Sequence, residues 1–439
     1  MMSGYGPFLH SIIAGLMIIT ITVSDVVAQD TIQLSHQDTL YQKVLELEKS
    51  LNEINKTISE QNQKDEFETL MKEADRLSSQ QEEVKVDVSK KYFSGVRQQQ
   101  GLNPNISFGM DFFGGVSTSD ASSISEPSDL GYGNNGFFLR EAQLSLVAPL
   151  DPFTRGKAFI AASSEGFVVD EVYMEWLNLP LNMNLKAGVF KSEFGFLNRF
   201  HDHALPQFDR PRVLVNMFGT GGLGGAGLAS NFLLPPVIAH ASSLDISVVY
   251  GSNPQSFSSE SEAGFVFTSQ FLNYYDLSAS SYLEIRLSGA AGKNDLPVGE
   301  FNSYVGSAGI AYKWAPVGRE KYRSLEWKTE FLYGLREYAG GSYKSKGFYS
   351  NIHNKLGARF WLGGRIGYSE LPYDPSQSEW DYTISIDFWQ SEFVLTRFQY
   401  QYNNRDIVNR IEIPGPYPSD HSFIIQVAWA MGPHKHEAY

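Results

Sequence analysis

The chain has 439 residues, of which 42% are hydrophobic and only 19% charged, with 30 Phe, 23 Tyr, 39 Gly and no Cys. The missing cysteines exclude a disulfide framework, a thiolate metal site and a cysteine nucleophile. The formal net charge of -14 argues against nucleic-acid binding, which needs clustered Lys and Arg.

The first 28 residues have the pattern of a secretory signal peptide. The apolar run IIAGLMIITITV at 12–23 is followed by Val26-Val27-Ala28, a small-residue cleavage sequence. The run is too short to span a bilayer as a helix. An uncleaved anchor is the alternative, because no Lys or Arg precedes the run. We expect cleavage after Ala28 and export of the mature chain.

Residues 29–100 are predicted to form a periplasmic coiled-coil segment. Apolar side chains recur at alternating intervals of four and three residues, as in a heptad seam: Leu40, Val44, Leu47, Leu51, Ile54 and Ile58. The seam indicates a homo-oligomer, for which a trimer is one candidate. The alternative is an amphipathic hairpin that folds back on itself at the polar break 61–66.

From 101 to 439 the hydrophobic pattern changes to period two, as in the alternation of LNMNLKAGVF at 181–190. Alternating segments separated by turn residues are typical of a membrane β-barrel. We therefore predict an all-β transmembrane antiparallel barrel of about sixteen strands. The strands are expected near 104–116, 137–148, 153–163, 168–177, 181–192, 223–234, 243–252, 264–274, 277–291, 301–314, 322–337, 346–354, 356–368, 379–389, 391–403 and 419–431.

The connections between these strands alternate in length. Short ones are expected at 150–152, 178–180, 275–276, 355 and 390, and long ones at 117–136, 193–222, 253–263, 369–378 and 404–418. Short periplasmic turns and long extracellular loops indicate a barrel in the cell outer membrane, with lipids as partners. A soluble β-sandwich array is the alternative, although it would not explain the export signal.

Three segments carry a resemblance to a known family: FFLREAQLSLVAPLDPFTRGKAF (137–159), VDEVYMEW (169–176) and LKAGVFKSEFGFLNRFHDH (185–203). They resemble the barrel of the phosphate-selective porin O/P superfamily, and more closely a branch sometimes labelled zinc-regulated outer-membrane receptors. That branch tends to carry a His-containing tail similar to GPHKHEAY at 432–439. The resemblance implies a diffusion channel for an anion or a metal complex. An anion channel needs a ladder of Lys and Arg, yet residues 103–439 hold 25 Lys and Arg against 34 Asp and Glu.

Two groups of residues are candidates for function. The first would line or constrict the pore, because rings of charged side chains set ion selectivity: Glu141, Arg155, Lys157, Glu171, Glu175, Lys186, Asn198, Arg199 and Arg210. These charges could instead pair across neighbouring strands and hold the wall rigid. The second group offers imidazole and carboxylate ligands suited to zinc: His201, His203, Asp202 and Asp209. A histidine pair that braces the 193–222 loop against the wall is the alternative.

The sequence contains no hydrolase, metalloprotease or nucleotide-binding motif, and no enzymatic activity is expected. The predicted function is a porin-like outer-membrane channel for passive diffusion of small hydrophilic solutes or ions, without a cofactor other than a candidate zinc ion. A zinc-related uptake barrel is one alternative. A closed barrel that tethers the coiled coil is the other.

Overall fold

The computed structural model describes residues 49, 104–118, 135–163, 166–250, 255–257, 264–294, 300–408 and 418–432. The expected signal peptide (1–28), coiled-coil segment (29–100, apart from Lys49) and histidine-containing tail therefore lie outside the described residues. Within the described part of the chain, no helix is both long enough and apolar enough to cross a lipid bilayer.

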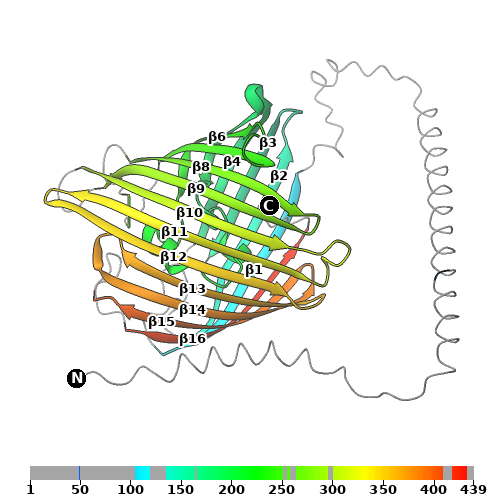
Figure 1. The fold of residues 1–439 in the computed structure, drawn as a ribbon. Coiled ribbons are helices and arrows are strands. Elements are labelled where there is room, and N and C mark those ends of the chain that lie inside the picture. The colour runs from blue at the N-terminus through cyan, green and yellow to red at the C-terminus, as the bar shows by residue number, and fades with distance from the viewer. Residues whose placement is uncertain are drawn as a thin grey trace, which may run out of the picture. The chain divides into compact units, whose positions relative to one another are not determined.

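Sixteen antiparallel strands close into one barrel, in which each strand pairs with its neighbours in sequence and β1 pairs with β16 (Figure 1). The strands are β1 (Asn105–Ser117), β2 (Gly136–Pro149), β3 (Thr154–Ser163), β4 (Gly166–Leu179), β5 (Met183–Lys191), β6 (Gly224–Leu234), β7 (Ala241–Tyr250), β8 (Phe265–Ser278), β9 (Ser281–Asn294), β10 (Phe301–Trp314), β11 (Ser324–Tyr338), β12 (Gly341–Lys355), β13 (Phe360–Leu371), β14 (Asp374–Ser391), β15 (Val394–Asp406) and β16 (Asp420–Met431). The predicted barrel and its strand count are confirmed.

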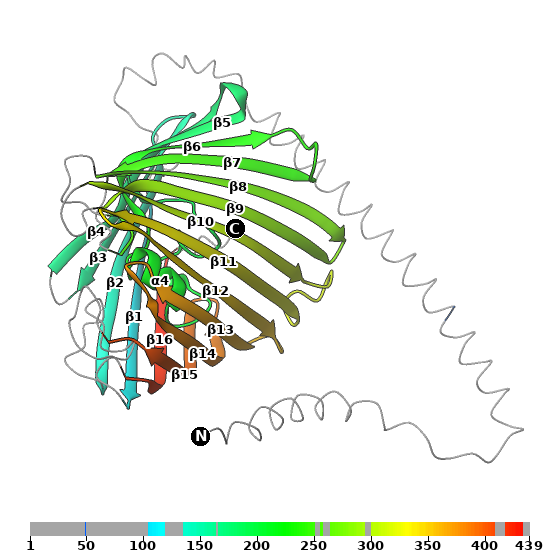
Figure 2. The same ribbon diagram turned by 60° about the vertical axis from the view of Figure 1, so that its left-hand side comes forward.

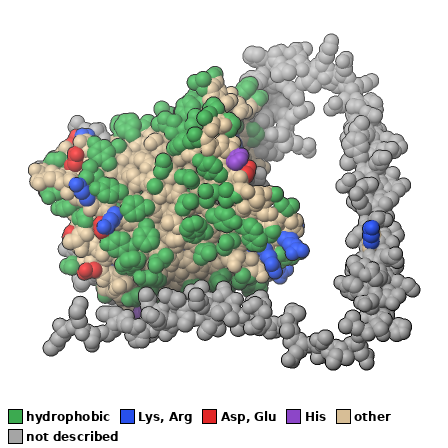
Figure 3. Space-filling model, viewed as in Figure 1, with side chains coloured by type: hydrophobic (Ala, Val, Ile, Leu, Met, Phe, Trp, Pro, Cys, Tyr) green, Lys and Arg blue, Asp and Glu red, His purple; other side chains and the backbone are tan. Residues whose placement is uncertain are grey.

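The two faces of the wall reverse the usual soluble pattern, with polar residues inside and apolar residues outside. In β15, Arg397, Gln399 and Gln401 are buried on the inner face, whereas Phe398 between them is 49% exposed on the outer face. On the face seen in Figure 3, hydrophobic side chains are spread over the outer wall. This alternation follows from the period of two in a strand, and it suits a wall with lipid outside and water inside.

The connections match the expected asymmetry in part, because at the rim of the long loops only two residues each join β3 to β4, β11 to β12 and β13 to β14. The turns at one rim are short, at 150–153, 180–182, 235–240, 279–280, 315–323, 356–359 and 392–393. We call this rim the short-turn rim. At the other rim the predicted long loop at 369–378 is wrong, because β13 runs on to Leu371 and β14 begins at Asp374. The polar residues there continue β13 and β14 past the apolar part of the outer wall, and the two strands remain paired up to a tight hairpin.

Candidate functional site: the lumen and its inner loop

Residues 192–223, between β5 and β6, fold into the barrel; we call them the inner loop. The loop contains the 3-10 helix η3 (Asp202–Ala204) and the short helix α4 (Arg212–Phe218), which lies inside the barrel in Figure 2. All seven residues of α4 are buried. The sequence already predicts a long loop at 193–222, and the structure places it across the lumen.

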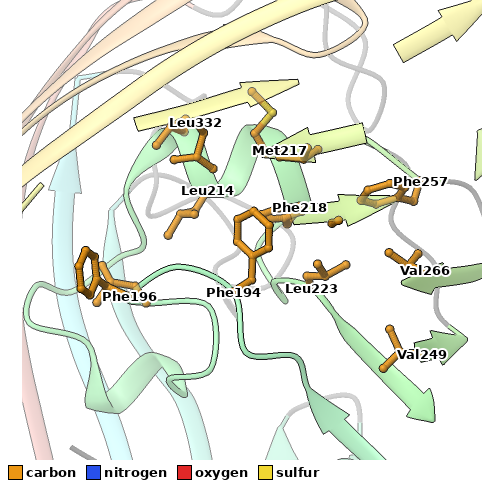
Figure 4. Close-up of a cluster of buried hydrophobic side chains, with 14 of the residues drawn as sticks. Phe194, Phe196, Leu214, Met217, Phe218, Leu223, Val249, Phe257, Val266 and Leu332 are labelled. Carbon is orange, nitrogen blue, oxygen red and sulfur yellow. The ribbon is translucent and has the colours of Figure 1, made fainter. Parts of the chain in front are cut away.

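The loop enters the lumen through an aromatic cluster. Phe194, Phe196, Leu214, Phe218 and Leu223 pack together and against wall residues that include Val249, Val266 and Leu332 (Figure 4). This apolar core lies inside the barrel, and about half of it comes from the inner loop. Burial of so many aromatic and aliphatic side chains fixes both the start and the end of the loop against the wall.

Gly195 forms a tight polar junction with the wall between two of these aromatic residues. Its N–H donates to Ser288 Oγ at 3.0 Å, and its carbonyl accepts from Arg286 Nη1 at 2.9 Å. The next residue, Phe196, donates its N–H to Glu330 Oε2 at 3.2 Å. Gly195 has φ +58°, a region that side chains with a Cβ avoid. The FGF sequence thus has a physical cause, since glycine permits the turn and the phenylalanines fill the cluster.

Asn198 closes the base of the loop. Its Nδ2 donates to the carbonyls of Ser192 at 2.7 Å and Leu223 at 2.8 Å, and its Oδ1 accepts from the N–H of Leu223 at 2.7 Å. The amide therefore joins the two ends of the inner loop like a backbone pair. This is a bracing role for a residue that the sequence suggested as pore-lining.

The tip of the loop reaches the opposite wall. Phe208 packs edge-on against Phe113 of β1, with ring centroids 4.7 Å apart, and joins a cluster with Phe138 and Ile424. Beside it, Asp209 accepts two hydrogen bonds of 3.0 Å from Arg365 Nη2 on β13. Both carboxylate oxygens of Asp209 are also bonded by strand β15, from Gln399 at 3.2 Å and Gln401 at 3.0 Å.

Helix α4 is held by a second buried polar network on the same side. Arg212 Nε donates to Glu379 Oε1 at 3.2 Å, and Asn216 Nδ2 donates to the same oxygen at 2.7 Å. The other oxygen of Glu379 accepts from Arg405 Nε at 3.1 Å. The inner loop is thus bound by charge-assisted hydrogen bonds from the polar inner face of the wall.

The two histidines of the inner loop bind carboxylates of the wall. His201 Nδ1 lies 3.0 Å from Asp170 Oδ2 on β4, and His203 Nδ1 contacts Glu141 Oε1 on β2. Their rings stack with centroids 5.8 Å apart. Burial lowers the pKa of His203, but the adjacent Glu141 carboxylate raises it more, so the net shift is upward.

The four candidate metal ligands are not gathered into one site. Asp202 accepts from Arg210 Nε at 3.1 Å, and Asp209 lies with Arg365 and two glutamines. Within the described residues there is no group of three His, Asp or Glu side chains placed to hold a metal ion. The pKa of Asp202 is raised by burial and lowered more by Arg210, so its carboxylate stays ionised beside that arginine.

The remaining candidate pore residues lie on β2 to β5 or in the loop. Arg155 pairs with Glu175 across β3 and β4, with 2.8 Å between Nε and Oε2. Lys157 and Lys186 both lie over the ring of Tyr173, with Nζ 5.4 and 4.6 Å from the centroid. Cross-strand pairing of this kind is the bracing alternative that the sequence left open.

Three further candidates contact the loop itself. Glu171 Oε1 accepts from the N–H of Lys191 at 2.8 Å, next to the start of the inner loop. Arg199 reaches Glu193 at 3.4 Å, and Arg210 donates to the carbonyl of Leu197 at 2.9 Å. Arg199 and Arg210 therefore help to shape the loop from within.

A cavity of about 540 Å³ remains in the lumen between the inner loop and the short-turn rim. We call it the vestibule. Its wall carries charges of both signs, which are Asp111, Glu141, Glu284, Glu326, Asp387, Arg286, Lys313, Lys328 and Arg397. Several are paired with each other, as in Arg397 with Asp387 at 2.9 Å and Lys328 with Glu326 at 2.7 Å.

Most of the vestibule and the anchors of the loop were missed by the sequence reasoning. Glu330, Arg365, Glu379 and Asp387 come from strands far along the chain from the inner loop. A signal was present in β14, where Glu379, Asp381, Thr383, Ser385 and Asp387 alternate with aromatic and aliphatic residues. That pattern identifies an inward polar face, but it does not say which loop the face binds.

Comparison with known proteins gives little at the level of sequence. No family model matches the chain. A protein of Aquifex aeolicus (strain VF5), described as uncharacterized, is 28% identical over 303 residues. The match covers 60% of this chain and 61% of the length of that protein.

Solved structures show a clear likeness of fold. The outer membrane channel DcaP of Acinetobacter baumannii aligns with a TM-score of 0.53 and 11% identity, over 77% of this chain and 99% of that one. OprB of Pseudomonas putida gives 0.53 and 10%, over 75% and 94%. The anion-selective porin from Comamonas acidovorans gives 0.52 and 9%, over 75% and 100%. At these identities the likeness establishes the barrel fold.

Proposed function

We propose that this protein is an outer-membrane channel that passes small hydrophilic solutes or ions by passive diffusion. The observation on which the proposal depends is the lumen, which contains a vestibule of about 540 Å³ with charged side chains of both signs, inside a wall whose outer face is apolar. The fold shared with DcaP, OprB and the Comamonas porin supports the same conclusion. The closer identification with phosphate-selective O/P porins, or with zinc-regulated receptors, rests on sequence segments alone.

In this proposal the inner loop sets the narrowest part of the path. It crosses from β5 and β6 to β1 and β13, so a solute must pass beside it. The charges of the vestibule nearly balance and largely pair with one another, which leaves a weak net field. Weak selectivity between cations and anions follows, since selectivity needs an excess of one sign along the path.

Single-channel recording in planar bilayers tests the proposal. We expect the purified full chain to give discrete current steps in KCl, with a small reversal potential under a salt gradient. A strong anion preference would favour the phosphate-porin identification instead. The absence of steps in every lipid tried would remove the channel and leave the closed barrel as a tether.

Zinc provides a second arm of the same experiment. The stacked pair His201 and His203 motivates it, although each ring is already bound to a carboxylate. If the barrel has a zinc-related role, zinc block of the current is lost when both histidines are changed to Ala. Equal block of both proteins, or none, leaves the histidines as braces only.

A further inference from the structure

The basic side chains of the short-turn rim are concentrated in one sector. Among the turns at this rim, Lys and Arg occur only at Arg319, Lys321 and Arg323 between β10 and β11, and at Arg359 between β12 and β13. The two turns are neighbours, because Ser324 at the start of β11 pairs with Lys355 at the end of β12. This concentration occurs in a chain with a net charge of -14.

The side chains of these four residues are exposed, in contrast to the paired charges of the lumen. Within the part of the chain that the structure describes, none of them has an ion pair with a carboxylate. The one acidic residue of the turn, Glu320, accepts from the N–H of Gly318 at 3.2 Å. Basic side chains gather at one edge of the barrel on the right of Figure 3.

Apolar side chains stand among the cations. Val317 is 67% exposed, Tyr322 56% and Leu356 63%. Just beyond the turns, the exposed rings of Trp327 and Phe360 continue into the apolar outer wall. Cations beside aromatic and aliphatic side chains at the end of a membrane strand match the boundary between lipid headgroups and acyl chains.

We propose that this sector, residues 315–323 and 356–359, is a binding site for the headgroups of anionic phospholipids in the leaflet at the short-turn rim. Arg319, Lys321, Arg323 and Arg359 bind the phosphate and the extra negative charge of the headgroup. Val317, Tyr322 and Leu356 lie against the glycerol and upper acyl region. The proposal rests on the membrane location in the proposed function, but not on conduction through the lumen.

Lipid is favoured over a soluble acidic partner because the N–H of Leu356 donates to the carbonyl of Phe360 at 2.9 Å, so the exposed Leu356 lies next to the exposed ring with which the outer wall begins at β13. Arginine suits a phosphate, to which its planar guanidinium donates two parallel hydrogen bonds. A site of this kind would hold a ring of anionic lipid at one side of the barrel only.

Native mass spectrometry of the full chain tests the site. The protein is equilibrated in detergent with equal amounts of phosphatidylglycerol and phosphatidylethanolamine, and the retained lipids are counted. We expect a preference for phosphatidylglycerol that falls in the triple variant Arg319→Gln, Lys321→Gln, Arg323→Gln. The loss should be about fivefold for each charge removed, and high salt should weaken the wild-type preference.

The double variant Lys344→Gln, Lys346→Gln is the control, since both lysines are exposed near the opposite rim. An equal loss in this control, or no preference in the wild type, overturns the proposal. Displacement of the lipid by inorganic phosphate alone also overturns it, because the apolar contacts would then contribute nothing.

Conductance and lipid preference of the wild-type protein, measured side by side, separate the two proposals. Current steps without lipid preference would leave the channel and remove the lipid site. Lipid preference without current steps would leave the lipid site and remove the channel.

Discussion

At the scale of single residues, His203 is the group whose charge links the inner loop to β2. Its pKa is raised by Glu141 above the ordinary value of about 6.5. A group with a raised pKa contributes stability that is fully present below its unfolded pKa and is lost as pH rises through the folded one. The contact of the loop with the wall should therefore weaken on the alkaline side of pH ~6.5.

Hydrogen exchange of the backbone amides at 200–208 measures this weakening. In the wild type we expect these amides to become more protected as the pH falls toward 6, because His203 then carries its charge beside Glu141. The comparison is made after correction for the intrinsic exchange rate at each pH. In His203→Gln this pH-dependent part should be absent. His240→Gln is the control, since His240 lies on a turn of the short-turn rim and bonds Asp276 at 3.1 Å. The same pH dependence in His203→Gln would show that another group is responsible.

At the scale of the element, the junction at Gly195 decides how firmly the inner loop is seated. A Cβ at this position would collide with the Glu330 carboxylate, and φ is +58°. Gly318 has a similar φ of +73°, but a Cβ there would meet nothing within 4 Å. The two glycines share the backbone strain and differ in the collision, so they form a matched pair.

We expect Gly195→Ala to lower the free energy of unfolding by roughly 2–5 kcal/mol, as strain and overpacking combine. Gly318→Ala should lower it by about 1–2 kcal/mol through strain alone. Urea unfolding of the barrel in lipid vesicles measures both. Single-channel recordings of Gly195→Ala should also show more current noise, because the loop is less firmly held. Equal losses of stability would mean that Glu330 moves aside without cost.

The elements of the wall were largely predictable and the lumen was not. Most strands follow from a local alternation, and LNMNLKAGVF at 181–190 gives β5 almost to its ends, whereas the Gly-rich sequence of β6 alternates only weakly. The prediction of a long loop between β13 and β14 was wrong, because the polar residues at the ends of these two strands have the composition of a loop and yet pair as strands. The contact of Asp209 with Arg365 spans 156 positions, and no periodicity encodes such a pairing.

At the scale of the whole molecule, the segment 29–100 and the barrel have separable roles in the proposed function. We expect deletion of residues 30–100 to leave the conductance of a single barrel unchanged, because the described lumen is built only from residues of the barrel. If the segment joins copies of the chain, the deletion should reduce the number of steps that open together. Light scattering of the purified proteins gives the oligomer number directly. A lost conductance with intact folding would contradict the separation.

The seating of Phe208 has a consequence for how the barrel is assembled. Phe208 packs on Phe113 of β1 and belongs to a cluster with Ile424 of β16, and these are the two strands whose pairing closes the wall. The tip of the inner loop therefore stabilises the final seam, and the seam in turn supplies the surface that receives the tip. We therefore expect closure of the barrel and docking of the loop to be cooperative, because each provides contacts that the other needs.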